Sequence, residues 1–398
     1  MKLRMFGATD KGLVRTINQD AYSCDAHLGI AVLSDGMGGH AAGEIASHMV
    51  VDGLSEILAK VSETPLEDLP DRIEDSVLAV NTKLLQRSHE DASCRGMGAT
   101  VNVLCFVHGH VTIGHVGDSR TYFIRGFTAQ GAKPRFGIWQ LTIDHNLGTF
   151  VDRGILALSA FSNSGTMSEK ERAKLTRGMG VMPDPKPDIY SKQLGEGDVF
   201  LTCSDGLHGF VSDRDILRTI IAGPISEAPQ RLIESAIAAG APDNVTVVLS
   251  IVSDSDEPLR EIQSQPLNSR PFLLRLPDGE IRGPHLAHEV IDLWTRRSLP
   301  GNTEISASLG NWLQLRNKEL VLGELPEFKQ ESYVNHIFYE TTEDSIGLSV
   351  SPQPRKEKLK GKSAPVLLKV FIIAFVGSAL IFASYFALTL SQLLLPAY

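Results

Sequence analysis

Cysteine is scarce in this sequence of 398 residues, and positive charge is not in excess. The 4 cysteines form no CxxC pair, which argues against a secreted disulfide scaffold and a zinc ribbon, so we expect reduced thiols. Lys and Arg number 38 against 47 Asp and Glu, which gives a formal net charge of −9. Because nucleic-acid binding usually requires a basic surface, we expect no nucleic-acid partner.

Charged residues are absent from one long apolar run, Val370–Leu395. As a helix this run would extend about 39 Å, which is enough to cross a hydrocarbon core of about 30 Å. The stretch before it, 355–369, carries six Lys and Arg residues and a single acid. By the positive-inside rule, we predict a single-pass membrane protein whose preceding chain is cytoplasmic. A buried helix of a soluble domain is the alternative.

The composition is otherwise that of a folded chain, with 42% hydrophobic and 21% charged residues. The length exceeds the roughly 100–200 residues of one domain, so we expect several parts. These are a first domain over 1–253, a polar linker over 254–269, a small domain over 270–322, a flexible tether over 323–365 and the membrane helix over 366–395.

Short β-branched and apolar runs in the first domain, bounded by Gly or Asp, predict strands. They are residues 30–34, 100–107, 110–116, 121–124, 198–202 and 244–252. Apolar residues at helical spacing predict amphipathic helices over 43–60 and 71–88. Two consecutive helices followed by several strands favour an α+β fold with antiparallel sheets over regular βαβ alternation.

Aspartates stand at the ends of several predicted strands. They are Asp20, Asp35, Asp118, Asp205 and Asp243. A single Asp-Gly after a strand is usually only a turn, but carboxylates crowded at one end of a sheet repel each other unless a cation lies between them. Oxygen ligands without His or Cys favour Mg²⁺ or Mn²⁺ over zinc. The sequence therefore predicts a site for divalent cations.

Seven motifs that contain these aspartates or lie between them occur in a fixed order. They are Arg15-Thr-Ile-Asn-Gln-Asp20, Asp35-Gly-Met-Gly-Gly-His40-Ala-Ala-Gly-Glu44, Gly98-Ala-Thr100, Gly114-His-Val-Gly-Asp118-Ser-Arg120, Leu141-Thr-Ile-Asp144-His145, Ser204-Asp205-Gly206 and Ala241-Pro-Asp243-Asn244. Together they resemble the bacterial branch of the PP2C (PPM) family of metal-dependent protein Ser/Thr phosphatases, over roughly residues 1–253. The resemblance implies a β-sandwich of two antiparallel sheets flanked by helices.

The resemblance also implies a site for two Mn²⁺ or Mg²⁺ ions. Its metal-site residues would be Asp20, Asp35 with the carbonyl of Gly36, Asp205 and Asp243. Arg15 would hold the substrate phosphate, because a planar guanidinium can bind two phosphate oxygens at once. A metal-bridging water would then attack phosphoserine or phosphothreonine directly, with no side-chain nucleophile. His40 would protonate the leaving oxygen, or it would only hydrogen-bond within its Gly-rich loop.

One position departs from the family pattern. Many relatives carry a second aspartate four residues after Asp205, but here Gly209 has no side chain that could ligate. We therefore predict that a third metal site, held by Asp118 and Asp205, is weak or absent. Residues Thr149–Arg177 lie where the family carries a flap over its cleft, and we expect this flap to select the substrate.

The small domain at 270–322 is predicted to contain a hairpin turning at Asp278-Gly279, a helix entered at Gly283-Pro284, and short strands. It resembles the bacterial GYF-like domain, which implies recognition of a peptide, for example a proline-rich one. The alternative is that Trp294 and Trp312 simply fill a small core.

The leading hypothesis is a membrane-tethered, metal-dependent protein Ser/Thr phosphatase acting on phosphoproteins that include a Ser/Thr kinase. One alternative is a catalytically silent docking protein, although a silent site has no physical reason to keep a self-repelling acid cluster. Another is a hydrolase of small phosphoesters, which would share the same site.

Overall fold

The computed structural model describes residues 2–38, 42–128, 135–156, 166–253, 265–266, 271–315 and 339–340. The chain divides into two units, Met1–Thr342 and Glu343–Tyr398, and the described residues all lie in the first. The predicted membrane helix therefore falls outside the described residues, as do most of the predicted linker and tether. Within the described part, no helix combines the length and the hydrophobicity that a bilayer crossing requires.

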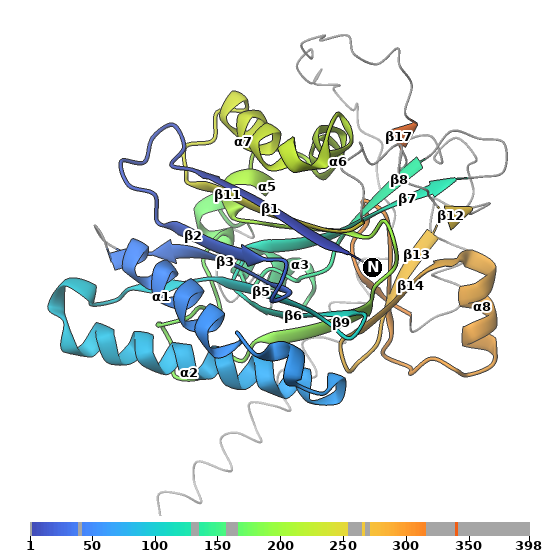
Figure 1. Cartoon of the computed structure of the whole chain (residues 1–398), viewed down its shortest axis with the longest axis horizontal. Helices are drawn as coiled ribbons and strands as arrows, with labels where there is room; N and C mark the ends of the chain where they lie inside the picture. Colours follow the sequence, from blue (N-terminus) through green and yellow to red (C-terminus); the bar gives the residue numbers. More distant parts are fainter. Residues whose placement is uncertain are drawn as a thin grey trace, which may run out of the picture. The chain divides into compact units, whose positions relative to one another are not determined.

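Two β-sheets stack to form a sandwich (Figure 1). Among the described residues, the first sheet has the strand order β1-β11-β10-β7-β8-β17, and β12 pairs with β7. Its strands are β1 (Leu3–Asp10), β7 (Arg120–Thr128), β8 (Arg135–Gln140), β10 (Val199–Cys203), β11 (Val245–Val252), β12 (Gln265–Pro266) and β17 (Tyr339–Glu340).

The second sheet has the order β16-β15-β13-β14-β9-β6-β5-β3-β2, and β4 pairs with β3. Its strands are β2 (Asp20–Asp25), β3 (Ile30–Met37), β4 (Gly98–Ala99), β5 (Val101–Val107), β6 (His110–Val116), β9 (Asp188–Gln193), β13 (Pro271–Arg275), β14 (Glu280–Leu286), β15 (Glu304–Ala307) and β16 (Leu313–Gln314). The described pairings are antiparallel except β14 with β9 and β12 with β7. The predicted sandwich of antiparallel sheets is thus confirmed.

Helices cover the outer faces of the sandwich (Figure 1). The α-helices of the described residues are α1 (Ala42–Ile57), α2 (Leu69–Glu90), α3 (Leu147–Asp152), α4 (Glu169–Arg172), α5 (Asp205–His208), α6 (Asp213–Ile221), α7 (Ala228–Ala238) and α8 (Ala287–Thr295). The helices α1 and α2 pack on the second sheet, whereas α6 and α7 pack on the first. The predicted helices and strands of the first domain are found within a few residues of their expected bounds.

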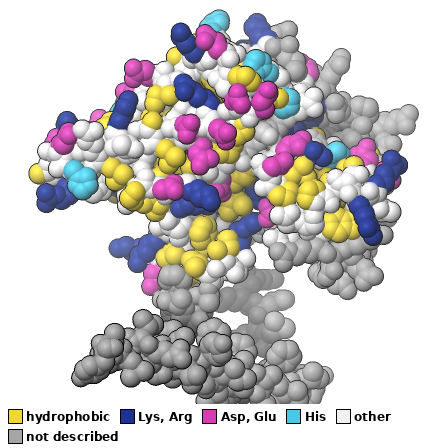
Figure 2. Space-filling view, turned by 90° about the horizontal axis from the view of Figure 1, so that it is seen from below, with side chains coloured by type: hydrophobic (Ala, Val, Ile, Leu, Met, Phe, Trp, Pro, Cys, Tyr) yellow, Lys and Arg dark blue, Asp and Glu magenta, His cyan; other side chains and the backbone are white. Residues whose placement is uncertain are grey.

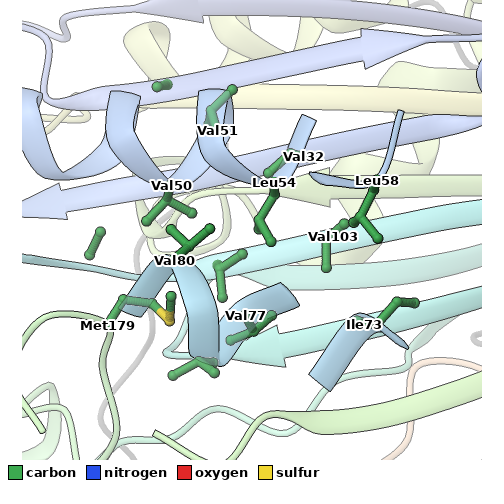
Figure 3. Packing of buried hydrophobic residues seen from close by; sticks show 14 of the residues in the cluster. Val32, Val50, Val51, Leu54, Leu58, Ile73, Val77, Val80, Val103 and Met179 are labelled. Atoms are coloured by element: carbon green, nitrogen blue, oxygen red, sulfur yellow. The ribbon is translucent and has the colours of Figure 1, made fainter. Parts of the chain in front are cut away.

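The helical layer over the second sheet is held by close apolar packing (Figure 3). Leu54 of α1 and Val77 of α2 meet Val103 of β5, and all three are fully buried. A side chain of this kind stabilises the fold by about 1.5–3 kcal/mol when it leaves water. A second cluster, which includes Phe123, Trp139 and Phe200, fills the space between the sheets. On the surface shown in Figure 2, acidic, basic and apolar side chains are interspersed.

The segment 271–315 extends the second sheet, because β14 pairs with β9. It has an apolar cluster of its own around Phe272 and Val290, but Trp312 packs into the core between the sheets. The hairpin turn at Asp278-Gly279 is confirmed. The expected helix entry at Gly283-Pro284 is wrong, because these residues lie inside β14 and the helix begins at Ala287. Proline has no N–H for a ladder, and the register shift in this hairpin accommodates it.

Candidate metal centre

The five aspartates singled out from the sequence lie where strands of both sheets begin or end. Asp20 opens β2, and Asp35 lies directly opposite it in β3. Asp118 lies between β6 and β7, Asp205 begins α5 immediately after β10, and Asp243 precedes β11. Two like charges that face each other across a strand pair are destabilising, so an arrangement of this kind calls for protons or cations.

A cavity of about 330 Å³ opens among these strand ends. Four of the aspartates line it, together with Arg15 and Gly36. They are Asp35, Asp118, Asp205 and Asp243. On another side the cavity is lined by Ala173 and Leu175, which lie in the region predicted to be a flap. The structure therefore brings together most of the residues that were predicted to form one site.

Asp20 lies behind the cavity and is only 4% exposed. Its Oδ2 accepts a hydrogen bond from the Ser204 hydroxyl (2.8 Å), and that hydroxyl oxygen accepts one from the N–H of Thr246 (2.9 Å). Its Oδ1 has no hydrogen-bond partner among the described residues. Burial raises the pKa of Asp20 to about 7; hydrogen bonds from Thr246 and Ser204 oppose this rise, and the charge of Asp205 adds to it.

The carboxyl groups that line the cavity are also hard to ionise. The pKa of Asp35 is raised well above its usual value, first by burial and then by the charges of Asp20 and Asp205. Burial and Asp205 raise the pKa of Asp118 to about 8. Burial and Asp243 raise the pKa of Asp205 to about 6. Each of these groups would hold its negative charge more readily beside a cation.

The donor set fits hard divalent cations that keep part of their water shell. In the described part of the chain, no three His, Cys, Asp or Glu side chains cluster closely enough to enclose one ion by themselves. Mg²⁺ is usually held by only one or two carboxylates, with water filling the other positions. Asp35, Asp205 and Asp243 around the cavity, with the carbonyl of Gly36, offer such ligands, and the unpartnered oxygen of Asp20 lies behind them.

Arg15 lies at the mouth of the cavity on the loop between β1 and β2. Its side chain is 50% exposed, and its Nη2 donates to Oδ2 of Asp243 at 2.8 Å. The loop is secured by Asn244, whose Nδ2 donates to the carbonyls of Lys11 (2.9 Å) and Ile17 (3.0 Å). Because guanidinium carries five N–H donors, Arg15 keeps donors for an incoming anion while it contacts Asp243.

The backbone of Asp118 is held by a histidine that the sequence analysis did not single out as functional. His208 Nε2 lies 3.0 Å from the carbonyl oxygen of Asp118. Burial lowers the pKa of His208 to about 3, so the ring is neutral and can donate this bond from Nε2–H.

Ser204 and Asn244 were also missed as supporting groups, although both stand in the quoted motifs. Their polar side chains directly neighbour the predicted ligands Asp205 and Asp243 in the sequence, and this proximity could have identified them as supporting groups. The predicted proton donor His40 lies outside the described residues.

Comparison with known proteins identifies the family of this chain. A family model described as protein phosphatase 2C matches residues 14–133. The protein phosphatase PhpP of Streptococcus pneumoniae is 31% identical over 253 residues, which is 62% of this chain and 97% of that protein. The chain belongs to the protein phosphatase 2C family.

Solved structures of this phosphatase family also match the chain. The Mycobacterium tuberculosis Ser/Thr phosphatase PstP/Ppp has a TM-score of 0.54 and 31% identity, covering 64% of this chain and all of that one. A structure of the PstP catalytic domain in complex with 2 manganese ions has a TM-score of 0.52 and 32% identity, covering 64% of this chain and 99% of that one. In sequence, the full-length M. tuberculosis PstP is 33% identical over 255 residues, and the match spans only 46% of its length.

Proposed function

We propose that this protein hydrolyses phosphoserine and phosphothreonine in protein substrates and that it depends on two Mn²⁺ or Mg²⁺ ions. The observation that carries the proposal is one cavity lined by Arg15 and four aspartates, of which Asp35, Asp118 and Asp205 have raised pKa values. Manganese in the related PstP catalytic domain supports the choice of metal.

Each residue's proposed role follows from its position in the cavity. Asp35, the Gly36 carbonyl, Asp205 and Asp243 would hold the ions, with Asp20 behind them. Two divalent ions held there would supply an activated water and would neutralise the phosphoryl oxygens. Arg15 would bind the phosphate through its remaining N–H donors and keep it at the cavity. Because the Arg15 side chain is half exposed at the mouth of the cavity, a phosphate carried on the surface of a protein could reach it.

Phosphate release from a phosphothreonine peptide tests this function. We expect release by the wild type with Mn²⁺, none after chelation, and a loss of at least about 100-fold in Asp205→Asn, since a removed metal ligand disables the charge stabilisation. Asp292→Asn, on the exposed face of α8, is the matched control and should behave as the wild type. Inactive wild type favours a silent docking protein, whereas turnover of p-nitrophenyl phosphate without turnover of the peptide favours a small-ester hydrolase.

We further propose that a third ion binds weakly or not at all. Asp118 is the remaining carboxylate, and Gly209 adds no ligand. Two Mn²⁺ ions per chain in titration calorimetry would support this statement, and a tight third ion would refute it.

The sequence supports tethering of the phosphatase to the bacterial plasma membrane by residues 366–395, with the phosphatase domain in the cytoplasm. Tethering would raise the local concentration of membrane-bound substrates, among which we include a Ser/Thr kinase. We retain the division into a domain over 1–253 and a small GYF-like domain over 270–322 that recognises a peptide. Loss of membrane association after removal of 366–398 would support the tether, and retention would contradict it.

A further inference from the structure

Glu304, at the start of β15, connects the C-terminal segment 271–315 to the phosphatase domain. Its Oε2 accepts a hydrogen bond from Arg275 Nε at 2.7 Å, and its Oε1 accepts one from Arg153 Nη2 at 2.6 Å. Arg275 is almost fully buried, stacks over the ring of Trp312 and donates to the carbonyl of Leu141 at 3.0 Å. One end of this connection is therefore anchored in the core.

The other end of the connection is helix α3. Arg153 directly follows the last residue of this helix, and its N–H donates to the carbonyl of Thr149. Its side chain is 26% exposed, and that of Glu304 is 13% exposed. A charge-assisted bond that is largely shielded from water holds its geometry better than an exposed pair does.

Helix α3 in turn is paired with the wall of the cavity. The N–H of Leu147 donates to the carbonyl of Lys174 at 2.9 Å, and Asn146 forms a β-bridge with Leu175. Leu175 and its neighbour Ala173 line the cavity that holds the aspartates. An unbroken series of contacts thus runs from Glu304 through α3 to the substrate side of the site.

We propose that Arg153 and Glu304 are positioning residues through which the C-terminal segment holds α3, and with it residues 173–175, in place against a phosphoprotein substrate. The proposal rests on the proposed phosphatase function. It assigns to 271–315 a role in substrate binding at the neighbouring site. A small ester is small enough to bind at the aspartates alone, so we expect the contact to matter for phosphoproteins and not for small esters.

Arg153→Met tests the contact because it removes only the Arg153 side of the bond. Glu304 stays in place as the partner of the buried Arg275. With Mn²⁺, we expect KM for a phosphothreonine peptide to rise about fivefold, while kcat and the hydrolysis of p-nitrophenyl phosphate stay within about twofold. Arg153→Lys should restore most of the peptide KM. The matched control is Arg296→Met, which removes an exposed pair with Asp292 in the same segment and should match the wild type.

A second readout does not depend on activity. Hydrogen exchange at the amides of Leu147 and Arg153 should accelerate in Arg153→Met and not in Arg296→Met. An unchanged peptide KM in an active protein, or an equal loss on both substrates with a lower melting temperature, overturns the proposal. If the wild type releases no phosphate from either substrate, the proposed function fails. In that case, amide exchange in Arg153→Met that equals that of the wild type overturns the proposed contact as well.

Discussion

Replacing Asp205 with asparagine should stabilise the metal-free protein while removing its response to Mn²⁺. The carboxylate lies at the start of α5, partly buried and close to Asp243. Asparagine has nearly the same shape but cannot ionise, so the substitution removes the repulsion and leaves the packing intact. A gain in stability from the loss of this acid would be hard to explain if the residue had only a structural role.

The size of the effect follows from the pKa of Asp205, which burial and Asp243 raise to about 6. The unfolded value is about 3.9, and a difference of about two units corresponds to about 3 kcal/mol at most. Solvent screening at this partly exposed group reduces the expected value to about 1–3 kcal/mol. The pKa of Asp205 is higher in the folded protein than in the unfolded chain. The ionised carboxylate therefore destabilises the fold fully above a pH of about 6 and not at all below a pH of about 4.

Thermal unfolding with a chelator present measures this directly. At pH 8 the midpoint of Asp205→Asn should lie about 5 °C above that of the wild type, and the two should converge near pH 4. Added Mn²⁺ should raise the wild-type midpoint well above its metal-free value and leave that of Asp205→Asn nearly unchanged. A less stable metal-free variant at pH 8, or an equal Mn²⁺ shift in both proteins, would refute the reasoning.

Three further outcomes are expected. Arg15→Ala should raise KM for a phosphopeptide about 10-fold or more in steady-state assays, since a charge-assisted bond to phosphate is lost; an unchanged KM would exclude Arg15 from phosphate binding. Although burial opposes it, hydrogen bonding from His145 lowers the pKa of Asp188. Asp188→Asn should therefore destabilise the protein in urea unfolding at pH 7, with the difference shrinking below pH of about 4; a pH-independent difference would contradict this. Leu54→Ala, in the fully buried contact of α1 with α2, should cost about 2–5 kcal/mol of unfolding free energy yet leave Mn²⁺ stoichiometry unchanged in calorimetry.

The gathering of the aspartates at strand ends was the most predictable feature of the candidate site. Its aspartates follow or precede short buried strands, and strand ends gather at one edge of a sheet whatever the exact register. The opposition of Asp20 to Asp35 in the ladder then follows from pairing of neighbouring strands in the sequence. The position of Asp20 behind the cavity was not predictable. Its carboxylate accepts a hydrogen bond from the Ser204 hydroxyl, and Ser204 is distant in sequence.

The C-terminal segment shows why the rest could not be read from local patterns. The pairing of β14 with β9 joins Glu280 to Ser191, and no local signal specifies a partner so far along the chain. Gly283-Pro284 matched a helix start, but tertiary pairing placed it inside a strand. The bond from Glu304 to Arg153 has the same origin, since each residue is an ordinary surface charge in its own stretch.

The most direct test of the central claim is the location of Mn²⁺ in crystals of the protein by anomalous scattering. The account predicts two strong peaks in the cavity, each within bonding distance of at least one oxygen from Asp35, the Gly36 carbonyl, Asp205 or Asp243. Crystals grown with Mn²⁺ that show no peak in this cavity, with the carboxyl groups protonated or paired to Arg and Lys instead, would contradict it.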